Sequence, residues 1–304
     1  MSSNAPGLVN WITLIFLGLI WGASFMSITV ALNGGAGPLS IAAIRLAIGA
    51  AALYAASNLL GYRLPGLGNT KLWLFILAVA LFTNALPFTA LGLALQHVPS
   101  AFAGVCMAAV PLLVLPLAHF LVPGETMSAR KSAGFAIGFC GVVMLIGLGS
   151  LTEGDSALPA RLACIGASFC YAIGSISTRL APPCHPIPFS AAALILASIF
   201  MVPIAFVYEG VPGAMTLPEW GALIYLGLGP TALATILLVR VIQTAGPSFM
   251  SLVNYQVPVW SVIFGVAILG EALPGQFLTA MALILSGLAL SRKRLRKPQD
   301  MPAA

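Results

Sequence analysis

The stretch Gln96-His-Val-Pro-Ser100 is written a second time, with one insertion, as Gln243-Thr-Ala-Gly-Pro-Ser248. Further landmarks recur at offsets of 146 to 148 residues: Pro111 with Pro258, Gly124-Glu125 with Gly270-Glu271, and Gly141 with Gly287. The sequence from about residue 11 to 149 thus resembles the sequence from about residue 163 to 290. A repeat of this size predicts two structurally equivalent halves.

Composition places the chain in a lipid bilayer. Of its 304 residues, 60% are hydrophobic and 7% are charged, and the mean hydropathy is +1.05. Soluble domains carry about 25% charged residues, so this chain has too few polar side chains to cover a water-soluble globule. The net charge of +6 does not indicate nucleic-acid binding, since five of the thirteen basic residues lie after residue 291. Such a tail predicts contact with anionic lipid headgroups.

Apolar runs of about 20 residues, the length with which a helix crosses the hydrocarbon core, recur along the chain. They predict ten spans, near residues 10–32, 38–60, 72–95, 100–121, 130–149, 158–180, 187–207, 218–240, 248–269 and 275–291. The first run is too long for the apolar part of a signal peptide, and no basic segment precedes it, so we expect it to be a span. The loops are short and leave no room for a soluble domain.

Five spans fall in each copy of the repeat. The predicted organisation is a first five-helix repeat over residues 1–152, a second over 153–291, and a basic cytoplasmic tail over 292–304. Because five is odd, the second copy enters the membrane from the opposite side. The predicted fold is an all-α membrane protein of ten transmembrane helices, in two inverted five-helix repeats around a central cavity. Carriers that open alternately to two compartments are commonly built this way.

Basic residues predict the orientation. With the amino terminus in the cytoplasm, eleven of the thirteen fall on the cytoplasmic side, which is the usual bias of membrane proteins. Of the other two, Arg161 falls outside and Arg45 lies within a span. We therefore predict a multi-pass protein of a bacterial-type inner (plasma) membrane with both termini cytoplasmic. The same assignment puts Glu125 at the inner face and Glu271 at the outer face.

Two further features match a known family. The first predicted span contains Leu17-Gly-Leu-Ile-Trp-Gly-Ala-Ser-Phe25, and the second holds Arg45 within Ala43-Ile-Arg-Leu46. Together with two five-span copies, each with a proline in its fourth span, a Gly-Glu turn and a glycine-rich last span, these residues resemble the EamA-type members of the drug/metabolite transporter superfamily. Within that family the chain is most similar to YddG-like exporters of aromatic amino acids. The resemblance covers about residues 10–291 and implies a metabolite exporter of the inner membrane.

A carrier needs polar or aromatic side chains near the bilayer midplane, where a polar group costs free energy unless it meets a partner, water or substrate. Such residues occur at corresponding places in the two copies. The predicted substrate-binding residues are Trp21, Ser24, Asn84, Met107, Tyr171, Ser175, Thr231, Asn254, Tyr255 and Trp260. The corresponding pairs are Trp21 with Tyr171, Asn84 with Thr231, and Met107 with Asn254.

Each of these residues has a structural alternative. A tryptophan within a span can fill space between helices, and Trp11, Trp73 and Trp220 lie where the aromatic residues of a membrane interface lie. Asparagine can join neighbouring helices through a hydrogen bond worth about 0.6 kcal/mol. Serine or threonine can bond back to its own helix. The sequence leaves these alternatives open.

Arg45 is the only permanently charged residue well inside a predicted span. It lies about 10 Å along the helix from Pro38, deep enough to cost several kcal/mol if it faced lipid. We expect it to face the protein interior or the mouth of the outer cavity. There it either attracts a substrate carboxylate or ties the carbonyls of neighbouring helix ends together. The resemblance favours the second, structural role, because an arginine recurs at this place in the family.

Pro111 and Pro258 lie near the middle of corresponding spans. Proline removes a helix hydrogen bond and kinks the helix. We predict paired bends at these two positions, which act as hinges beside the cavity. Packing alone is the alternative, since other spans contain proline as well.

The sequence lacks the motifs of enzyme chemistry. Its five cysteines and three histidines show neither CxxC nor HExxH spacing, so neither a metal site nor a cofactor is predicted. It has no Walker A motif for ATP. All seven acidic residues lie at span ends, in loops or in the tail. Since proton-driven carriers usually place a carboxylate or histidine in mid-membrane, we expect substrate to flow down its own gradient or with weak coupling.

These observations predict a secondary or facilitative transporter that exports aromatic and other neutral amino acids, or related small metabolites, by alternating access. A carrier of sugar phosphates, nucleosides or drugs on the same fold is the alternative, although a phosphorylated substrate would require more than one basic residue in the cavity. A membrane-embedded enzyme is less favoured. The predicted partners are the small-molecule substrate and the lipid bilayer, with no nucleic acid. The sequence is compatible with a monomer and does not fix the oligomeric state.

Overall fold

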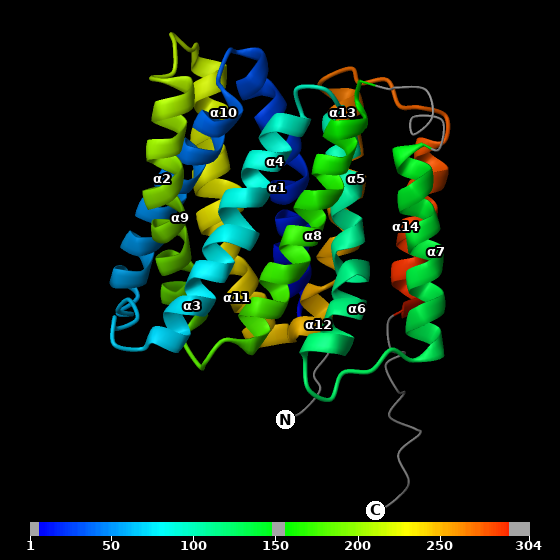
Figure 1. The fold of residues 1–304 in the computed structure, drawn as a ribbon, viewed down its shortest axis with the longest axis horizontal. Coiled ribbons are helices and arrows are strands. Elements are labelled where there is room, and N and C mark those ends of the chain that lie inside the picture. The colour runs from blue at the N-terminus through cyan, green and yellow to red at the C-terminus, as the bar shows by residue number, and fades with distance from the viewer. Residues whose placement is uncertain (1–5, 148–155, 292–304) are drawn as a thin grey trace, which may run out of the picture.

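Helices that stand side by side make up the protein (Figure 1). The computed structural model describes residues 6–147 and 156–291, and every regular element in this part of the chain is helical. We call residues 6–147 the first half and residues 156–291 the second half. The lower end of the bundle is the end at which α1 (Leu8–Asn33) begins and α14 (Phe277–Ser291) ends.

Nine stretches of helix within the described residues are long and apolar enough to span a membrane. In chain order they are α1, α2 (Pro38–Leu59), α3 to α4 (Thr70–Ala94), α5 to α6 (Ser100–Leu121), α7 (Ala129–Ile146), α8 (Leu158–Leu180), α9 (Pro186–Glu209), α10 to α11 (Leu217–Ala245) and α12 to α13 (Pro247–Ala267). Each coincides with one of the first nine predicted ranges. The tenth range forms α14, whose 15 residues are fewer than the about 20 that a span needs. The count of ten spans therefore stays a prediction.

Glycine and proline produce the tight connections between the helices. Pro38 and Pro186 lie in the first turn of α2 and α9, where the N–H that proline lacks would have had no helical partner. Gly124 and Gly270, the glycines of the two Gly-Glu turns, have φ angles of 81° and 67°. Glycine adopts this left-handed region without strain, which explains why both turns carry it.

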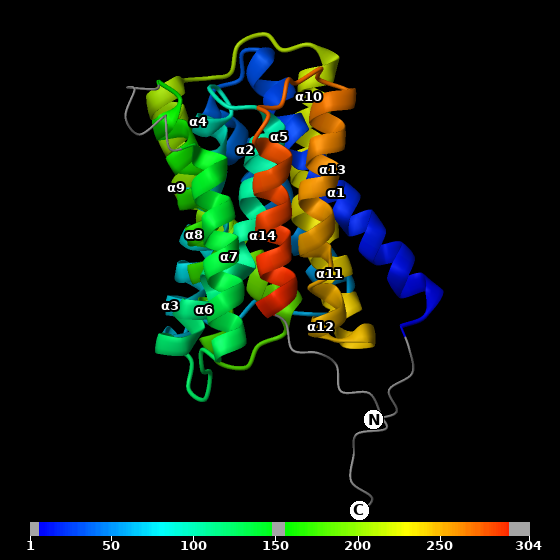
Figure 2. The same cartoon turned by 90° about the vertical axis from the view of Figure 1, so that its right-hand side faces the viewer.

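The packing pairs helices of the first half with helices of the second. The closest pairs are α7 with α14, α2 with α9, and α1 with α13. Figure 2 shows α7 and α14 side by side on one face of the bundle. Their contact depends on glycine, since a Cβ on Gly287 would lie 2.4 Å from the carbonyl oxygen of Gly134. Small residues let helix backbones approach this closely.

Two spans contain a π-helical turn at matching places. Within the third span, η1 (Ala80–Ala85) separates α3 (Thr70–Val79) from α4 (Leu86–Ala94). Within the eighth, η4 (Leu228–Leu233) separates α10 (Leu217–Gly227) from α11 (Ala234–Ala245). Such turns are rare in proteins, and many of those that are found lie at functional sites. The sequence gives no indication of either turn.

The predicted paired bends at the prolines take different forms. In the fourth span, α5 (Ser100–Cys106) passes through a 3₁₀ turn, η2 (Met107–Ala109), into α6 (Val110–Leu121), so that Pro111 stands at the start of a new helix. In the ninth span, α13 (Val253–Ala267) continues through Pro258. The two positions thus correspond in sequence but differ in backbone, and their role as hinges stays a prediction.

Candidate functional site

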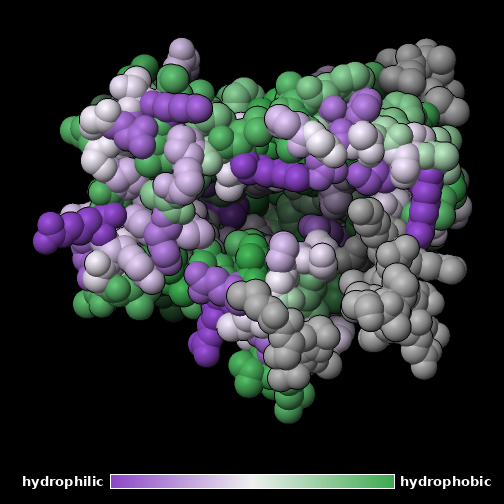
Figure 3. Space-filling view, turned by 90° about the horizontal axis from the view of Figure 1, so that it is seen from below, coloured by the Kyte–Doolittle hydropathy of each residue, from purple (hydrophilic) through white to green (hydrophobic). Residues whose placement is uncertain are grey.

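A cavity of about 710 Å³ lies among the first four spans of each half, whereas α7 and α14 contribute no lining residue. Residues of the loop between α8 and α9, and of the last turns of α11, line its lower part. The lower face of the molecule is hollowed at its centre (Figure 3). The cavity is therefore open at the end of the bundle where α1 begins.

Eight of the ten predicted substrate-binding residues line this cavity. They are Trp21, Ser24, Asn84, Met107, Tyr171, Ser175, Thr231 and Asn254. They come from both halves, and each of the three corresponding pairs contributes both of its members. The structure thus brings together side chains that lie up to 233 residues apart in the sequence.

Tyr255 and Trp260, the other two predicted residues, do not line the cavity. Trp260 packs on α1 instead, where a Cβ at Gly22 would lie 2.5 Å from its Cβ. Its ring also stacks on that of Phe264, with 6.1 Å between centroids. Gly22 leaves room for the Cβ and backbone of Trp260, so this tryptophan packs between two helices, which is the structural alternative for a tryptophan within a span.

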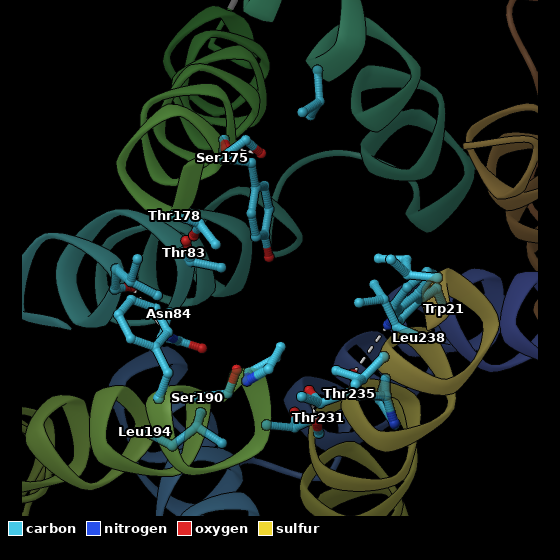
Figure 4. Close-up of a pocket in the computed structure, with 18 of the residues that line it drawn as sticks. Trp21, Thr83, Asn84, Ser175, Thr178, Ser190, Leu194, Thr231, Thr235 and Leu238 are labelled. Atoms are coloured by element: carbon cyan, nitrogen blue, oxygen red, sulfur yellow. Dashed lines mark hydrogen bonds between the residues drawn. The ribbon is translucent and has the colours of Figure 1, made fainter. Parts of the chain in front are cut away.

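Trp21 forms part of the cavity wall and is held in place by the second half. Its Nε1 donates to the carbonyl oxygen of Pro230, in the π turn η4, at 3.0 Å. Figure 4 shows Trp21 and Leu238 facing Asn84, Thr83 and Ser175 across open space. The indole ring is therefore fixed at the boundary between the halves and presents an apolar face to the cavity.

Asn84 and Thr231 make the same local bond in the two halves. Asn84 Nδ2 donates to the carbonyl oxygen of Val79 at 3.1 Å, and Thr231 Oγ1 donates to that of Leu226 at 2.8 Å. Both bonds reach back five residues, at the places where the third and eighth spans pass into their π turns. Asn84 thereby keeps its amide oxygen as a free acceptor in the cavity, and Thr231 keeps its oxygen lone pairs.

Arg45 uses those lone pairs. Its Nε donates to Thr231 Oγ1 at 2.9 Å, and its Nη1 makes a long contact of 3.5 Å with Ser24 Oγ. The guanidinium carbon lies 3.7 Å from the centroid of the Phe88 ring, in cation–π geometry. In the structural role expected from the sequence, Arg45 would bind the carbonyl groups of neighbouring helix ends. Its contacts in the structure are instead with two hydroxyl groups and an aromatic ring. Arg45 lines the cavity although only 5% of its surface is exposed.

Other hydroxyls of the cavity bond back to their own helices. Ser175 donates to the carbonyl of Tyr171, and Thr235 donates to that of Thr231. These bonds orient the hydroxyl oxygens as acceptors. Thr83 differs, since its buried Oγ1 has no hydrogen-bond partner among the residues that the structure describes.

Sequence reasoning missed several polar lining residues: Thr83, Thr178, Ser190, Thr235 and Gln243. Spacing could have found two of them, because Thr178 and Thr235 lie three and four residues after Ser175 and Thr231, on the same helix faces. Thr83 adjoins Asn84 but reaches the cavity through the π turn, which the sequence did not indicate.

Carboxylates bridge helix ends at the upper end of the bundle. Glu271 accepts hydrogen bonds from the backbone N–H groups of Ser100 at 2.6 Å and Ala101 at 3.0 Å, where the fourth span begins. Glu209 accepts from the N–H groups of Leu39 and Ser40, where α2 begins. A carboxylate at a helix amino terminus makes charge-assisted bonds with otherwise unpaired donors.

The lower end has a different arrangement around Glu125, the repeat counterpart of Glu271. Glu125 forms ion pairs with Arg179 at 2.7 Å and with Lys131 at 3.2 Å. These hydrogen bonds, led by the one from Arg179, hold the pKa of Glu125 below its ordinary value. His119 Nδ1 lies 3.3 Å from the backbone carbonyl oxygen of Glu125. Glu125 thus contacts the start of α7 and the end of α8, and not the ninth span.

Comparison with known proteins identifies the family. The EamA-like transporter family matches the chain twice, over residues 9–147 and 158–292. The chain belongs to this family. It is a multi-pass membrane transporter and not an enzyme.

Curated relatives of this transporter match along most of its length. It is 27% identical over 282 residues to the inner membrane transporter YedA of Escherichia coli (strain K12), covering 91% of this chain and 88% of that protein. It is 25% identical over 305 residues to the aromatic amino acid exporter YddG of Ancylobacter novellus, covering 98% and 100%. The transporter YoaV of Bacillus subtilis (strain 168) is 24% identical over 284 residues, covering 91% and 94%. A solved crystal structure shares the fold with a TM-score of 0.65, at 22% identity and over 95% of this chain and 98% of that one.

Proposed function

We propose that this transporter exports aromatic and other neutral amino acids, or related small metabolites, by alternating access. The observation that carries the proposal is the cavity between the halves, which is open at one end and combines apolar walls with amide, hydroxyl and guanidinium groups. Such a lining suits a small amphipathic molecule. The similarity to an aromatic amino acid exporter along nearly the whole chain supports the same substrate class.

The proposal includes two inverted repeats of five spans each. Two separate matches to one family support the repeat. Opposite directions support the inversion, since α1 runs upwards and its counterpart α8 runs downwards (Figure 1). The packing of α2 with α9 and of α7 with α14, each a pair of counterparts, is what a two-fold relation between the halves produces. The helix α14 then forms the tenth span.

The orientation follows from the basic residues. The end of α2, the starts of α3 and α7 and the end of α8 lie at the lower end of the bundle (Figure 1), and Arg63, Lys71, Arg130 and Arg179 lie in or beside these segments. The positive-inside bias assigns that end to the cytoplasm. In this orientation the cavity is open to the cytoplasm, as required for an exporter that loads its substrate there. Both termini are then cytoplasmic, in an inner membrane such as that of YedA.

Substrate moves down its own gradient in this proposal. Arg45 is the only charged side chain among the described residues that line the cavity, and none of those residues is a carboxylate or a histidine. A proton-driven mechanism would need a titrating group there. The single basic residue also disfavours phosphorylated substrates, for which clusters of cations are usual.

Counterflow into liposomes tests the function. Liposomes that contain the protein and unlabelled phenylalanine should accumulate labelled phenylalanine transiently, and Trp21→Ala and Asn84→Ala should slow the uptake. Trp260→Leu, outside the cavity, is the matched control for loss of a large aromatic ring. If a panel of amino acids gives no counterflow while nucleosides or sugars do, the substrate class is wrong. If an imposed pH gradient drives strong uphill accumulation, the gradient-driven mechanism is wrong.

A further inference from the structure

We propose that Arg45 forms the subsite for the carboxylate group of the substrate. The inference rests on the proposed transport function and specifies which chemical group of the substrate the cavity recognises. It reverses the structural role that family resemblance favours for this arginine.

Arg45 has hydrogen-bond donors that the protein does not use. Arg45 carries five N–H donors, yet its contacts use only Nε and, at 3.5 Å, Nη1. No described residue accepts a hydrogen bond from its Nη2. This atom is not fully enclosed either, since the fully enclosed side-chain atoms without a partner in the described chain are Thr83 Oγ1, Ser100 Oγ and Ser198 Oγ. The outer face of the guanidinium is therefore open to the cavity. Two donors in a fork on that face match the geometry of a carboxylate.

The charge of Arg45 has no carboxylate partner among the described residues. A buried guanidinium is normally paired, since an isolated charge in an apolar interior is strongly unfavourable. Every acidic residue in the described chain is engaged elsewhere: Glu125 with Arg179, Glu209 and Glu271 with helix starts, and Glu219 with Thr216. The Phe88 ring and two hydroxyls compensate the charge only in part. A substrate anion completes the compensation.

Arg45 lies in the same cavity as Trp21 and Asn84. Ser24, which contacts Arg45, follows Trp21 by three residues and lies on the same face of α1. A carboxylate bound at Arg45 thus places the rest of the molecule beside the indole ring, with the free oxygen of Asn84 in the same cavity as an acceptor for an ammonium group. This arrangement fits an amino acid that has an apolar side chain.

Competition in the native protein tests this subsite without any mutation. Labelled phenylalanine counterflow should be inhibited by 3-phenylpropionate, which keeps the carboxylate and lacks the amine, at least about tenfold more strongly than by phenethylamine, which keeps the amine and lacks the carboxylate. Equal or stronger inhibition by phenethylamine would overturn the proposal. Absence of counterflow with any amino acid would instead reject the proposed function.

Ligand stabilisation tests the subsite independently of transport. 3-Phenylpropionate should raise the melting temperature of the purified protein, and Arg45→Gln should abolish the rise, whereas Ser24→Ala should keep most of it. Arg45→Lys should restore part of the rise, since it returns the charge without the fork. A rise of equal size in Arg45→Gln would contradict the subsite. If Arg45→Gln does not fold, the comparison of 3-phenylpropionate with phenethylamine in the native protein decides the question.

A different observation carries a second inference. The two Gly-Glu turns correspond in the repeat, and the Glu271 turn is bonded to the N–H groups at which the fourth span begins, at the closed upper end. The N–H groups of Ser248 and Phe249 correspond in the repeat to those of Ser100 and Ala101. They lie where the ninth span begins, at the open lower end, and are the expected partners of Glu125. We infer that Glu271 and Glu125 are latches that engage alternately. Glu125 moves from Arg179 and Lys131 to the ninth span when the lower end closes, and Glu271 releases the fourth span when the upper end opens.

Thiol labelling without substrate tests the latches. The reporter is Gln243→Cys, at the lower mouth of the cavity, in a protein whose five native cysteines are replaced. Glu271→Gln removes the charge from the upper latch, so the rate at which an impermeant maleimide labels the reporter from the lower side should fall about tenfold. The matched control is Glu209→Gln, which removes the same kind of contact between α9 and α2, a pair that stays packed along its length. An unchanged rate in Glu271→Gln, or an equal fall in both variants, would overturn the inference.

Discussion

The two Gly-Glu turns share their sequence and their glycine conformation but differ in their contacts. At the upper end Glu271 bonds the start of the fourth span through two backbone N–H groups. At the lower end Glu125 is held by two cations, the exposed Arg179 and the half-buried Lys131, away from the span that would be its equivalent partner. In the proposed inverted repeat the two turns are equivalent, and their different contacts in this structure distinguish the two ends. The upper end is sealed by backbone bonds and the lower end is open.

A second contrast between the ends lies where the fourth and ninth spans cross. At the upper crossing, a Cβ on Gly104 would lie 1.9 Å from Ser261 Oγ and 2.2 Å from its Cβ. The repeat counterpart of Gly104 is Ser251, which is half-buried near the lower end. Glycine is thus present where the helices touch and absent where they stand apart.

The largest expected effect comes from filling the upper crossing. Gly104→Val should destabilise the protein by about 1–3 kcal/mol or more, because its side chain overlaps Ser261 in a packed contact. Ser251→Val, the matched change at the lower end, should cost much less. Unfolding in detergent measures both. Equal losses in the two variants would show that the ends are equally closed and would break the comparison.

An intermediate effect is expected from the paired aromatic residues of the cavity wall. Trp21→Phe loses the bond to the carbonyl of Pro230 and should cost about 0.5–1.5 kcal/mol, with a larger loss of counterflow. Tyr171→Phe, at the corresponding position, removes a hydroxyl that makes no hydrogen bond to another described residue and should leave stability nearly unchanged. A greater loss of stability in Tyr171→Phe would contradict the asymmetry between the halves.

The smallest effect is expected at the lower turn. Arg179→Gln removes an exposed ion pair with Glu125, and such pairs are worth only about 0–1 kcal/mol. Labelling of Gln243→Cys from the lower side should fall by less than about fivefold. A fall as large as that in Glu271→Gln would mean that the lower turn controls the open state.

The pH dependence of that turn has a definite sign. Arg179 and Lys131 lower the pKa of Glu125, so the ion pairs persist above its ordinary value of 4.5 and are lost only as the pH falls through the lowered pKa. Between about pH 8 and pH 6 labelling should not change on account of Glu125. A midpoint in that range that survives in Glu125→Gln would assign the titration to a group other than Glu125.

The sequence predicted the membrane spans and most of the cavity for simple physical reasons. Spans follow from apolar length, and polar residues such as Asn84 and Thr231 stand out because few residues of that kind occur in mid-span. Trp260 does not line the cavity, and the sequence could not distinguish this, because an aromatic residue in mid-span has the same appearance whether it lines a cavity or packs beside Gly22. The π turns and the free face of Arg45 depend on backbone geometry and on contacts between the halves, which a sequence read along one chain does not contain.

The most direct test of alternating access uses one cysteine that lines the cavity, Thr235→Cys in a protein free of other cysteines. Its labelling by an impermeant maleimide is measured from each side of oriented membrane vesicles, with and without Glu271→Gln. We predict rapid labelling from the side of the lower end and slow labelling from the other side, and the substitution should change the two rates in opposite directions. Rates that rise or fall together, or no labelling from the upper side under any condition, would contradict a carrier whose two ends open in turn.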